Sequence, residues 1–284
     1  MALKNIFICL FLIIFLLPDT VYSEGRISSF EENLAANFFL NFRMLTFKEF
    51  DSPEYISDKP WDIGLGLRYK NIFASFSLPA PFIKQPKRLG YDIEISSYFE
   101  RAYFEAYSKR YPNLIEQDSN EYSDVDVDSS GIIVIFLQNS ENHSLGSAIK
   151  LNKKQNQSSG SLLYGFGIFH SSLYSTNGTI EKFSDKQNLL YFGPGLGYSY
   201  LWTFKNCAFL NISLLSFMNP GININTDRWL FIPQLQPRIV IGHHNDTWSA
   251  NLTMMNNAKF IIWNKDEIDS LTLISISIMF SKRF

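Results

Sequence analysis

The sequence predicts an all-β protein: a transmembrane antiparallel up-and-down β-barrel of about 12 strands, which follows a cleaved signal peptide. Three observations predict this fold. The last segment alternates apolar and mostly polar residues, an apolar stretch near the first residue is too short to span a bilayer, and further alternating segments occur along the whole chain. In a barrel that spans a membrane, the apolar side of each strand faces lipid and the polar side faces the lumen.

The last segment has the clearest alternation. Its apolar positions are Ile274, Ile276, Ile278, Phe280 and Phe284. Serine fills most of the positions between them, so one face of a strand is apolar and the other polar. A strand that ends on an aromatic C-terminus is expected to close an outer-membrane barrel, and we expect these five residues to be its assembly signal. The alternative is a soluble sheet whose last strand happens to end in Phe.

The first 23 residues have the form of a secretory signal peptide. Lys4 precedes an apolar run over residues 6–17, and Val21, Tyr22 and Ser23 come before the expected cut. The run falls short of the roughly 20 residues that a spanning helix needs. We therefore expect residues 1–23 to be a signal peptide and residues 24–284 to form one outer-membrane barrel domain. An uncleaved anchor is the alternative.

Composition narrows the class of protein. The net charge of −2 argues against a nucleic-acid-binding protein, which would carry a basic patch. Cys207 is the one cysteine after the expected cut, so an exported chain would have no internal disulfide. The 26 Phe and 14 Tyr residues suit the aromatic girdles at the two membrane interfaces. The expected partners are outer-membrane lipid and, during insertion, the barrel-assembly machinery, and we expect a monomer.

Alternating segments between Gly-, Asn- and Ser-rich turns predict the individual strands. The expected ranges are about 36–49, 60–70, 72–80, 90–108, 130–139, 144–153, 160–170, 190–203, 207–218, 231–243, 247–262 and 271–284. Within 90–108 the parity changes, because Glu105 falls on the face of Ile93 and Ile95, which predicts a bulge or two short strands there. The assignment also leaves a long acidic loop over residues 109–129 on the periplasmic side. Pro233 and Pro237 predict a bulge or a later start in the tenth strand, because proline removes a ladder hydrogen bond.

The polar face of the expected strands defines a candidate lumen network. Its members are Arg68, Asp92, Glu94, Lys150, Gln234, Gln236 and Arg238. Opposite charges in a narrow interior of low dielectric should pair, because an unpaired buried charge is costly. A selective ion pore would instead carry a ring of one sign. The mixture of charges therefore predicts a plugged lumen with little conductance.

Several short stretches resemble an uncharacterised family of Gram-negative outer-membrane β-barrel proteins, which is catalogued as a domain of unknown function. The stretches that carry the resemblance are Trp61-Asp62-Ile63-Gly64-Leu65-Gly66, Phe76-Ser77-Leu78-Pro79, Gly90-Tyr91-Asp92-Ile93, Gln157-Ser158-Ser159-Gly160-Ser161 and Tyr191-Phe192-Gly193-Pro194-Gly195-Leu196-Gly197-Tyr198. The resemblance spans most of the chain after the expected cut. It implies the barrel fold and the outer membrane, and it implies no activity.

His170 and Ser172 form the one candidate catalytic pair. They lie two residues apart on an expected strand, on the outward face shared with Tyr164 and Phe166. A His base that activates a Ser nucleophile is the chemistry of a lipase, and outer-membrane lipases resemble this arrangement. No orienting acid is identifiable nearby, so a His at the membrane interface is the competing interpretation.

The acidic residues Asp124, Asp126 and Asp128 resemble an oxygen-ligand set for Ca²⁺, but Ser129 replaces the glycine that an EF-hand loop requires. We therefore expect a solvated acidic stretch, no metal site and no cofactor. The sequence thus predicts a bacterial outer-membrane barrel without demonstrable catalytic activity, structural or binding in role, with exposed loops and a plugged lumen. An outer-membrane phospholipase and a small-solute channel are the alternatives.

Overall fold

The computed structural model describes residues 26–48, 54–57, 60–80, 89–99, 101–116, 122–175, 186–264 and 267–284. The expected signal peptide lies outside the described residues. No helix among the described residues is long and apolar enough to cross a membrane.

Most of the described chain is β-strand. The elements are β1 (Ile27–Ser29), β2 (Leu34–Lys48), β3 (Glu54–Ser57), β4 (Trp61–Tyr69), β5 (Ile72–Pro79), β6 (Tyr91–Tyr98), β7 (Ala102–Glu116), β8 (Tyr122–Leu137), α2 (Leu145–Ile149), β9 (Lys153–Gln155), β10 (Ser159–Ser175), β11 (Gln187–Thr203), β12 (Ala208–Asn223), β13 (Arg228–His244), β14 (Trp248–Asn264) and β15 (Glu267–Arg283).

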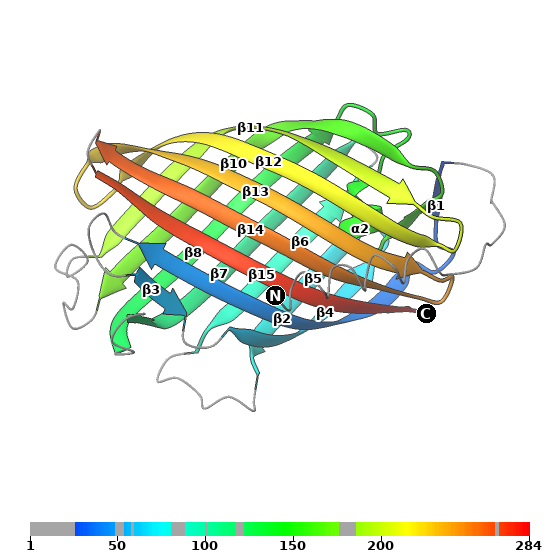
Figure 1. Cartoon of the computed structure of the whole chain (residues 1–284), viewed down its shortest axis with the longest axis horizontal. Coiled ribbons are helices and arrows are strands. Elements are labelled where there is room, and N and C mark those ends of the chain that lie inside the picture. Colours follow the sequence, from blue (N-terminus) through cyan, green and yellow to red (C-terminus); the bar gives the residue numbers. More distant parts are fainter. Residues whose placement is uncertain are drawn as a thin grey trace, which may run out of the picture.

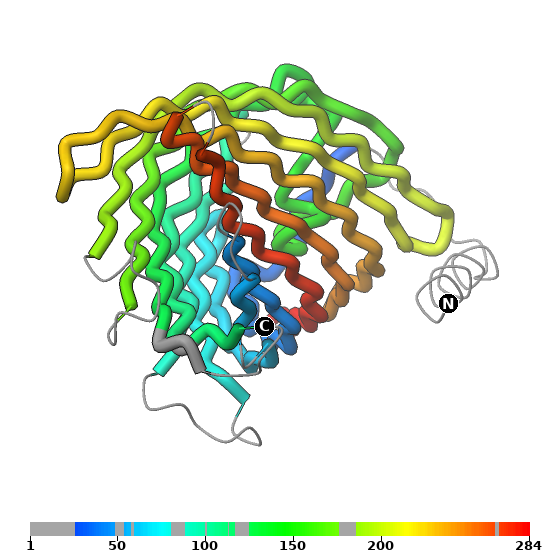
Figure 2. Tube along the Cα trace, turned by 60° about the vertical axis from the view of Figure 1, so that its left-hand side comes forward, coloured from blue at the N-terminus to red at the C-terminus, as the bar shows by residue number. Residues whose placement is uncertain are grey.

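Twelve of these strands form a closed antiparallel wall, in the order β2, β4, β5, β6, β7, β8, β10, β11, β12, β13, β14, β15. The wall closes because β15 pairs with β2, from Ser270 opposite Lys48 to Arg283 opposite Ala35. Figure 2 shows this closure, with the last strands in red beside the first in blue. We call the end where β2 begins and β15 ends the terminal end, and the opposite end the distal end.

The wall presents its apolar side outward. Leu65 and Ile278 are 67% and 53% exposed, whereas Asn37 and Ser281 on the other face are buried. The inward face carries polar side chains together with a buried cluster of aliphatic and aromatic ones, such as Ile135 and Phe169. A closed wall with an outward apolar band is the arrangement of a barrel that spans a membrane, so the predicted fold class is confirmed.

The wall is shorter on one side. The strands β4, β5 and β6 have only 8 or 9 residues, whereas their neighbours β2 and β7 have 15. The short strand β3 continues the sheet beyond them, because it pairs with β2 at Thr46 and with β7 at Leu114. Figure 1 shows β3 near the distal end, away from the C-terminus.

The predicted strand number is confirmed, although two of the predicted strands are wrong. Residues 90–108, counted as one strand although the parity change also allowed two, form two strands: β6 ends at Tyr98, and β7, which begins at Ala102, pairs back with it from Tyr103 opposite Tyr98. Residues 144–153 form no strand of the wall, since they contain α2 and the start of β9. The two errors cancel in the count.

Two other expectations are also corrected. Most of the predicted loop 109–129 is strand, because β7 runs to Glu116 and β8 begins at Tyr122. These two strand ends lie at the distal end of the barrel. The strand that holds Pro233 and Pro237 begins at Arg228 without a bulge. Its register against β14 is unchanged across both prolines, from Phe231 opposite Ile262 to Arg238 opposite Met255. The prolines are tolerated because the residues beside them continue the ladder.

Candidate functional site

The connection between β8 and β10 folds into the lumen as a plug. We call residues 138–158 the plug; it contains α2 and β9. Ser144 caps α2, since its hydroxyl accepts a hydrogen bond from the backbone N–H of Ser147. Leu145 and Ala148 of α2 lie three residues apart and are buried, and so is Leu151 beyond the end of the helix. The spacing of Leu145 and Ala148 places them on one side of a helical turn, so this part of the segment that alternation assigned to a strand packs as a helix.

The plug is held by strands on nearly opposite sides of the wall. Lys150 at the end of α2 forms a 2.5 Å ion pair with Glu94 of β6. Asn251 of β14 donates a 2.8 Å hydrogen bond to the carbonyl of Ala148. Because β6 and β14 are far apart in the closed sheet, the plug crosses the lumen between them. In Figure 1, α2 lies within the barrel toward the end where the C-terminus lies.

At the terminal end, the segment before β2 packs against the plug, and together they form the base of the barrel. β1 pairs with β9 of the plug, from Ile27 opposite Gln155 to Ser29 opposite Lys153. The guanidinium of Arg283 lies 3.3 Å from the ring centre of Phe30. The terminal end is therefore closed by two chain segments that contact each other and the wall.

His143 anchors the plug to β11. Its Nδ1 faces the carbonyl oxygen of Ser159 at 3.1 Å, and its Nε2 faces the hydroxyl of Ser199 at 3.0 Å. A carbonyl only accepts, so Nδ1 carries the proton of the neutral ring and Nε2 accepts from Ser199. Burial lowers the pKa of His143 to about 4. The plug is thus fastened by a neutral imidazole.

We expect the plug to loosen in acid because of His143. The folded pKa of about 4 lies below the ordinary value of 6.5, so the unfolded segment binds a proton that the docked segment excludes. The free energy by which neutral His143 stabilises the docked plug is fully present above pH 6.5 and is lost as the pH falls toward 4. The loss should reach about 3 kcal/mol. Hydrogen exchange of the amides at 144–152 should accelerate over this range, and His143→Gln should remove that pH dependence.

The inner face of the wall carries an ion-pair network that links β4, β6 and β7 to β2. We call Arg43, Asp62, Asp92 and Lys109 the wall network. Arg43 lies 2.5 Å from the Asp92 carboxylate and 3.4 Å from that of Asp62. Lys109 reaches the same Asp92 oxygen at 3.1 Å. Asp92 thus compensates two cations inside the barrel, and the network joins β2, β4, β6 and β7 where the wall is short.

Two adjoining hollows occupy the middle of the lumen. The larger has about 660 Å³ of free space, and its walls are Tyr103, Glu105, Tyr107, Ile133, Ile135, Leu145, Ile149, Leu163, Ser213, Leu215, Gln236, Arg238, Met255 and Asn257. The smaller has about 400 Å³, and its walls are Leu45, Tyr107, Lys109, Tyr111, Val127, Ser129, Asn257, Lys259, Leu271 and Leu273. Tyr107 and Asn257 belong to both. The plug forms the floor of the larger hollow through Leu145 and Ile149.

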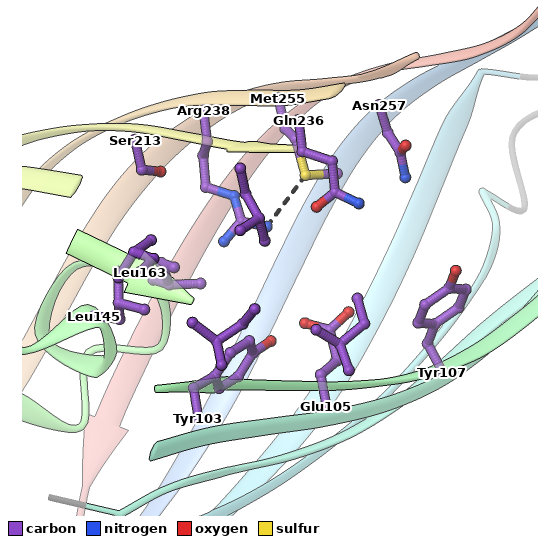
Figure 3. A pocket seen from close by; sticks show the side chains of 14 residues that line it. Tyr103, Glu105, Tyr107, Leu145, Leu163, Ser213, Gln236, Arg238, Met255 and Asn257 are labelled. Atoms are coloured by element: carbon purple, nitrogen blue, oxygen red, sulfur yellow. Dashed lines mark hydrogen bonds between the residues drawn. The ribbon is translucent and has the colours of Figure 1, made fainter. Parts of the chain in front are cut away.

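Opposite charges face each other across the larger hollow. Figure 3 shows Arg238 reaching from one wall toward Glu105 on the other. They form no ion pair, since Arg238 donates instead to the sulfur of Met255 at 3.2 Å. Isoleucine, leucine, methionine and tyrosine side chains form most of the lining of this hollow, and a few polar side chains lie among them. Such a lining is typical of sites for small molecules.

The residues predicted for the lumen network all lie inside the barrel, but they do not form one network. Glu94 and Lys150 pair with each other, and Asp92 belongs to the wall network. Gln236 and Arg238 line the larger hollow. Two lie apart from these: Arg68 donates to backbone carbonyls of Glu32 and Lys70 at the terminal end, and Gln234 donates to Asn257.

Sequence reasoning missed Arg43, Asp62, Glu105, Lys109 and Lys259. Asp62 has the parity of Arg68, and Arg43 has the parity opposite to the apolar Phe42 and Met44, so alternation could have found both. Glu105 has the parity of the outward Ile93 and Ile95, a conflict that indicated a bulge or two strands without deciding the face of Glu105. Because β6 ends at Tyr98 and β7 begins at Ala102, parity restarts between them, and Glu105 and Lys109 both line the hollows.

His170 and Ser172 lie near the distal end of β10 with the parity of the exposed Tyr164 and Phe166, but Ser172 is buried. No hydrogen bond joins them, and the Ser172 hydroxyl is buried without a partner among the described residues. Asp128 stands opposite Ser172 on β8, but it pairs with Arg110. The contacts that a lipase needs for proton transfer are thus not made in this structure.

The predicted acidic stretch is part of β8. Asp126 is fully buried and accepts a hydrogen bond from Tyr174 at 2.8 Å, with Arg110 at 3.7 Å. Among the residues that the structure describes, no three His, Cys, Asp or Glu side chains come together as a possible metal site.

The solved structures that resemble this chain are outer-membrane proteins. One is an outer-membrane channel from Pseudomonas putida F1, with 7% identity and a TM-score of 0.42, over 93% of this chain and 100% of that one. Another is the P. putida toluene transporter TodX, with 7% identity and a TM-score of 0.29, over 92% and 91%. A third is OmpT of Vibrio cholerae, with 8% identity and a TM-score of 0.29, over 88% and 100%. No curated protein matches the chain.

The family comparison covers nearly the whole sequence. The model of a domain of unknown function, DUF4421, matches residues 19–278. This range includes all twelve strands of the wall except the last residues of β15. The chain therefore belongs to the DUF4421 family, a domain of unknown function.

Proposed function

We propose that this protein is a binding barrel that holds a small molecule in the lumen above a closed base. The observation that carries the proposal is the pair of adjoining hollows in the middle of the barrel. Side chains from several strands line both hollows, and Tyr107 and Asn257 belong to both linings. Tyrosine and aliphatic side chains supply most of the lining, and a few charged groups would orient the ligand.

The closed base supports binding over free passage. The plug contacts β6, β11 and β14 through Lys150, His143 and Asn251. A solute that entered the hollows would meet Leu145 and Ile149 of the plug as a floor. A permanently open small-solute channel is therefore the weaker candidate. No observation in the structure favours a phospholipase over the binding barrel or over the small-solute channel.

We place the protein in the bacterial outer membrane as an exported monomer, with its terminal end in the periplasm. The support is the signal-peptide pattern of residues 1–23 and the alternating C-terminal strand. Phe284 extends from the terminal end with 67% of its surface exposed, and its amide donates to the carbonyl of Leu34. This exposure suits recognition by the barrel-assembly machinery, and the surrounding lipid would contact the apolar exterior.

Filling the hollows should abolish binding. In Leu215→Trp and Leu273→Trp, an indole occupies the larger and the smaller hollow respectively. Native mass spectrometry of the purified barrel with phenylacetate, phenylethanol or phenethylamine should show one bound molecule in the wild type. One or both variants should bind at least about tenfold more weakly, because the ligand and the indole compete for the same space.

The neighbouring residues Leu214 and Ile274 provide matched controls. Both point outward, with 47% and 37% of their surfaces exposed, so Leu214→Trp and Ile274→Trp add the same bulk on the lipid side. These two variants should bind the compounds as the wild type does. If none of the three compounds binds to the wild type, or if both inward variants bind as well as it does, the proposal is wrong.

A further inference from the structure

Lys259 is a buried cation in the wall of the smaller hollow. It lies on β14, and only 6% of its surface is exposed. Its ammonium group donates to the hydroxyl of Tyr191 at 2.9 Å and to that of Ser129 at 3.2 Å. An ammonium group has three donors. The third has no partner among the described residues.

No carboxylate compensates this charge within the described part of the chain. The other lysines of the lumen differ in this respect, since Lys109 contacts Asp92 at 3.1 Å and Lys150 contacts Glu94 at 2.5 Å. The two partners of Lys259 are neutral hydroxyls. A buried cation without an anion is costly, and proteins usually pair it. The structure thus holds a preformed positive site that lacks its counter-charge.

The surroundings of Lys259 are otherwise suited to an apolar molecule. Leu45, Leu271 and Leu273 form one side of the smaller hollow, and Tyr107 and Tyr111 project from β7 on the other. Beside Lys259 on the same strand, Asn257 accepts a hydrogen bond from Gln234. The NH₂ group of Asn257 makes no hydrogen bond to another described residue, so it is available as a second donor.

We propose that the smaller hollow binds an amphipathic organic acid, with its anionic group on Lys259 and its apolar body against the leucines and tyrosines. This inference rests on the proposed function and names the class of ligand. Charge-assisted hydrogen bonds are about twice as strong as neutral ones, and they gain strength where water is excluded. The acid supplies the missing anion for Lys259. A neutral analogue leaves the charge unpaired, and an ammonium analogue adds a second cation beside it.

Three compounds with the same aromatic body test this order: phenylacetate, phenylethanol and phenethylamine. Their dissociation constants for the full-length barrel are measured by native mass spectrometry or titration calorimetry. For the wild type, phenylacetate should bind at least about tenfold more tightly than phenylethanol, and phenethylamine should bind most weakly. Lys259→Met keeps the length of the side chain and removes its charge, so it should reduce the preference for the acid to less than about threefold.

Lys282→Met is the matched control, because it removes the same charge from an exposed position on the outer side of β15. It should keep the wild-type order, and Lys259→Arg should retain the preference for the acid. Equal binding of the acid and the alcohol by the wild type would overturn the inference while leaving the proposed function intact. Unchanged acid binding in Lys259→Met would do the same. Binding of none of the three compounds would overturn both.

If Lys259→Met does not fold, the order of the three dissociation constants for the wild type decides the inference. A barrel that migrates differently in electrophoresis before and after heating has folded, so this measurement accompanies each variant.

Discussion

Replacement of residues 142–156 by a short Gly-Ser linker should convert the closed barrel into a conducting one. These residues carry α2, β9 and the anchors His143 and Lys150. Without them, the strands β8 and β10 remain joined as a hairpin, and their pairing from Leu137 opposite Leu163 is retained. The wall of twelve strands does not depend on the plug, because each of them pairs with two neighbours.

The expected change is large, since the plug crosses the lumen and forms the floor of the larger hollow. Side chains fill barrels of about 8 strands, whereas barrels of about 16 strands are open, so a twelve-stranded wall has room for a water path once the plug is gone. In planar bilayers, the wild type should show little conductance and the variant stable single channels.

The matched control is the same linker in place of the turn 224–227, which joins β12 to β13 at the distal end. This variant should remain closed. Stable channels in the wild type would contradict the plugged lumen. A folded but silent plug variant would show that side chains of the wall seal the lumen without help from the plug.

Asp92→Asn should cause the largest loss of stability among single substitutions in the lumen. Its carboxylate compensates Arg43 at 2.5 Å and Lys109 at 3.1 Å. The amide would leave Lys109 without an anion and Arg43 with only Asp62 at 3.4 Å. Loss of one partner from a buried ion pair costs about 3–5 kcal/mol. The free energy of unfolding, measured by urea titration in lipid vesicles, should fall by this amount.

Glu267→Gln provides the comparison for Asp92→Asn. Glu267 pairs with Arg228 at 3.2 Å, but both side chains are substantially exposed at the distal end. Exposed pairs contribute about 0–1 kcal/mol, so the effect should be small. The double variant of Asp92→Asn with Lys109→Met should recover part of the lost stability, because it removes the stranded cation. Similar effects of the two single Asp92 and Glu267 variants would contradict the assignment of a buried network.

Much of the wall could be predicted from local pattern. Alternation identified the outward Ile274 and Ile278 and the inward Arg68, because a strand turns successive side chains to opposite faces. At Glu105 the change of parity indicated a bulge or two strands but did not decide between them, because either one shifts the alternation. The sequence also pointed to a mixture of charges in the lumen. It did not indicate which charges would pair, since parity assigns a face and not a neighbour.

By itself, the sequence determined the barrel class and the side of the wall on which most residues lie, whereas its strand count agreed because two errors cancelled. These properties depend on period-two patterns within each strand. Only the tertiary structure decided that residues 144–153 leave the wall and fill the lumen, because Leu145 and Ile149 lie on one face of a helical turn as well as on one face of an alternating strand. It also brought Lys259 beside Ser129, 130 residues away. That contact depends on the closure and register of the whole sheet, which no local pattern encodes.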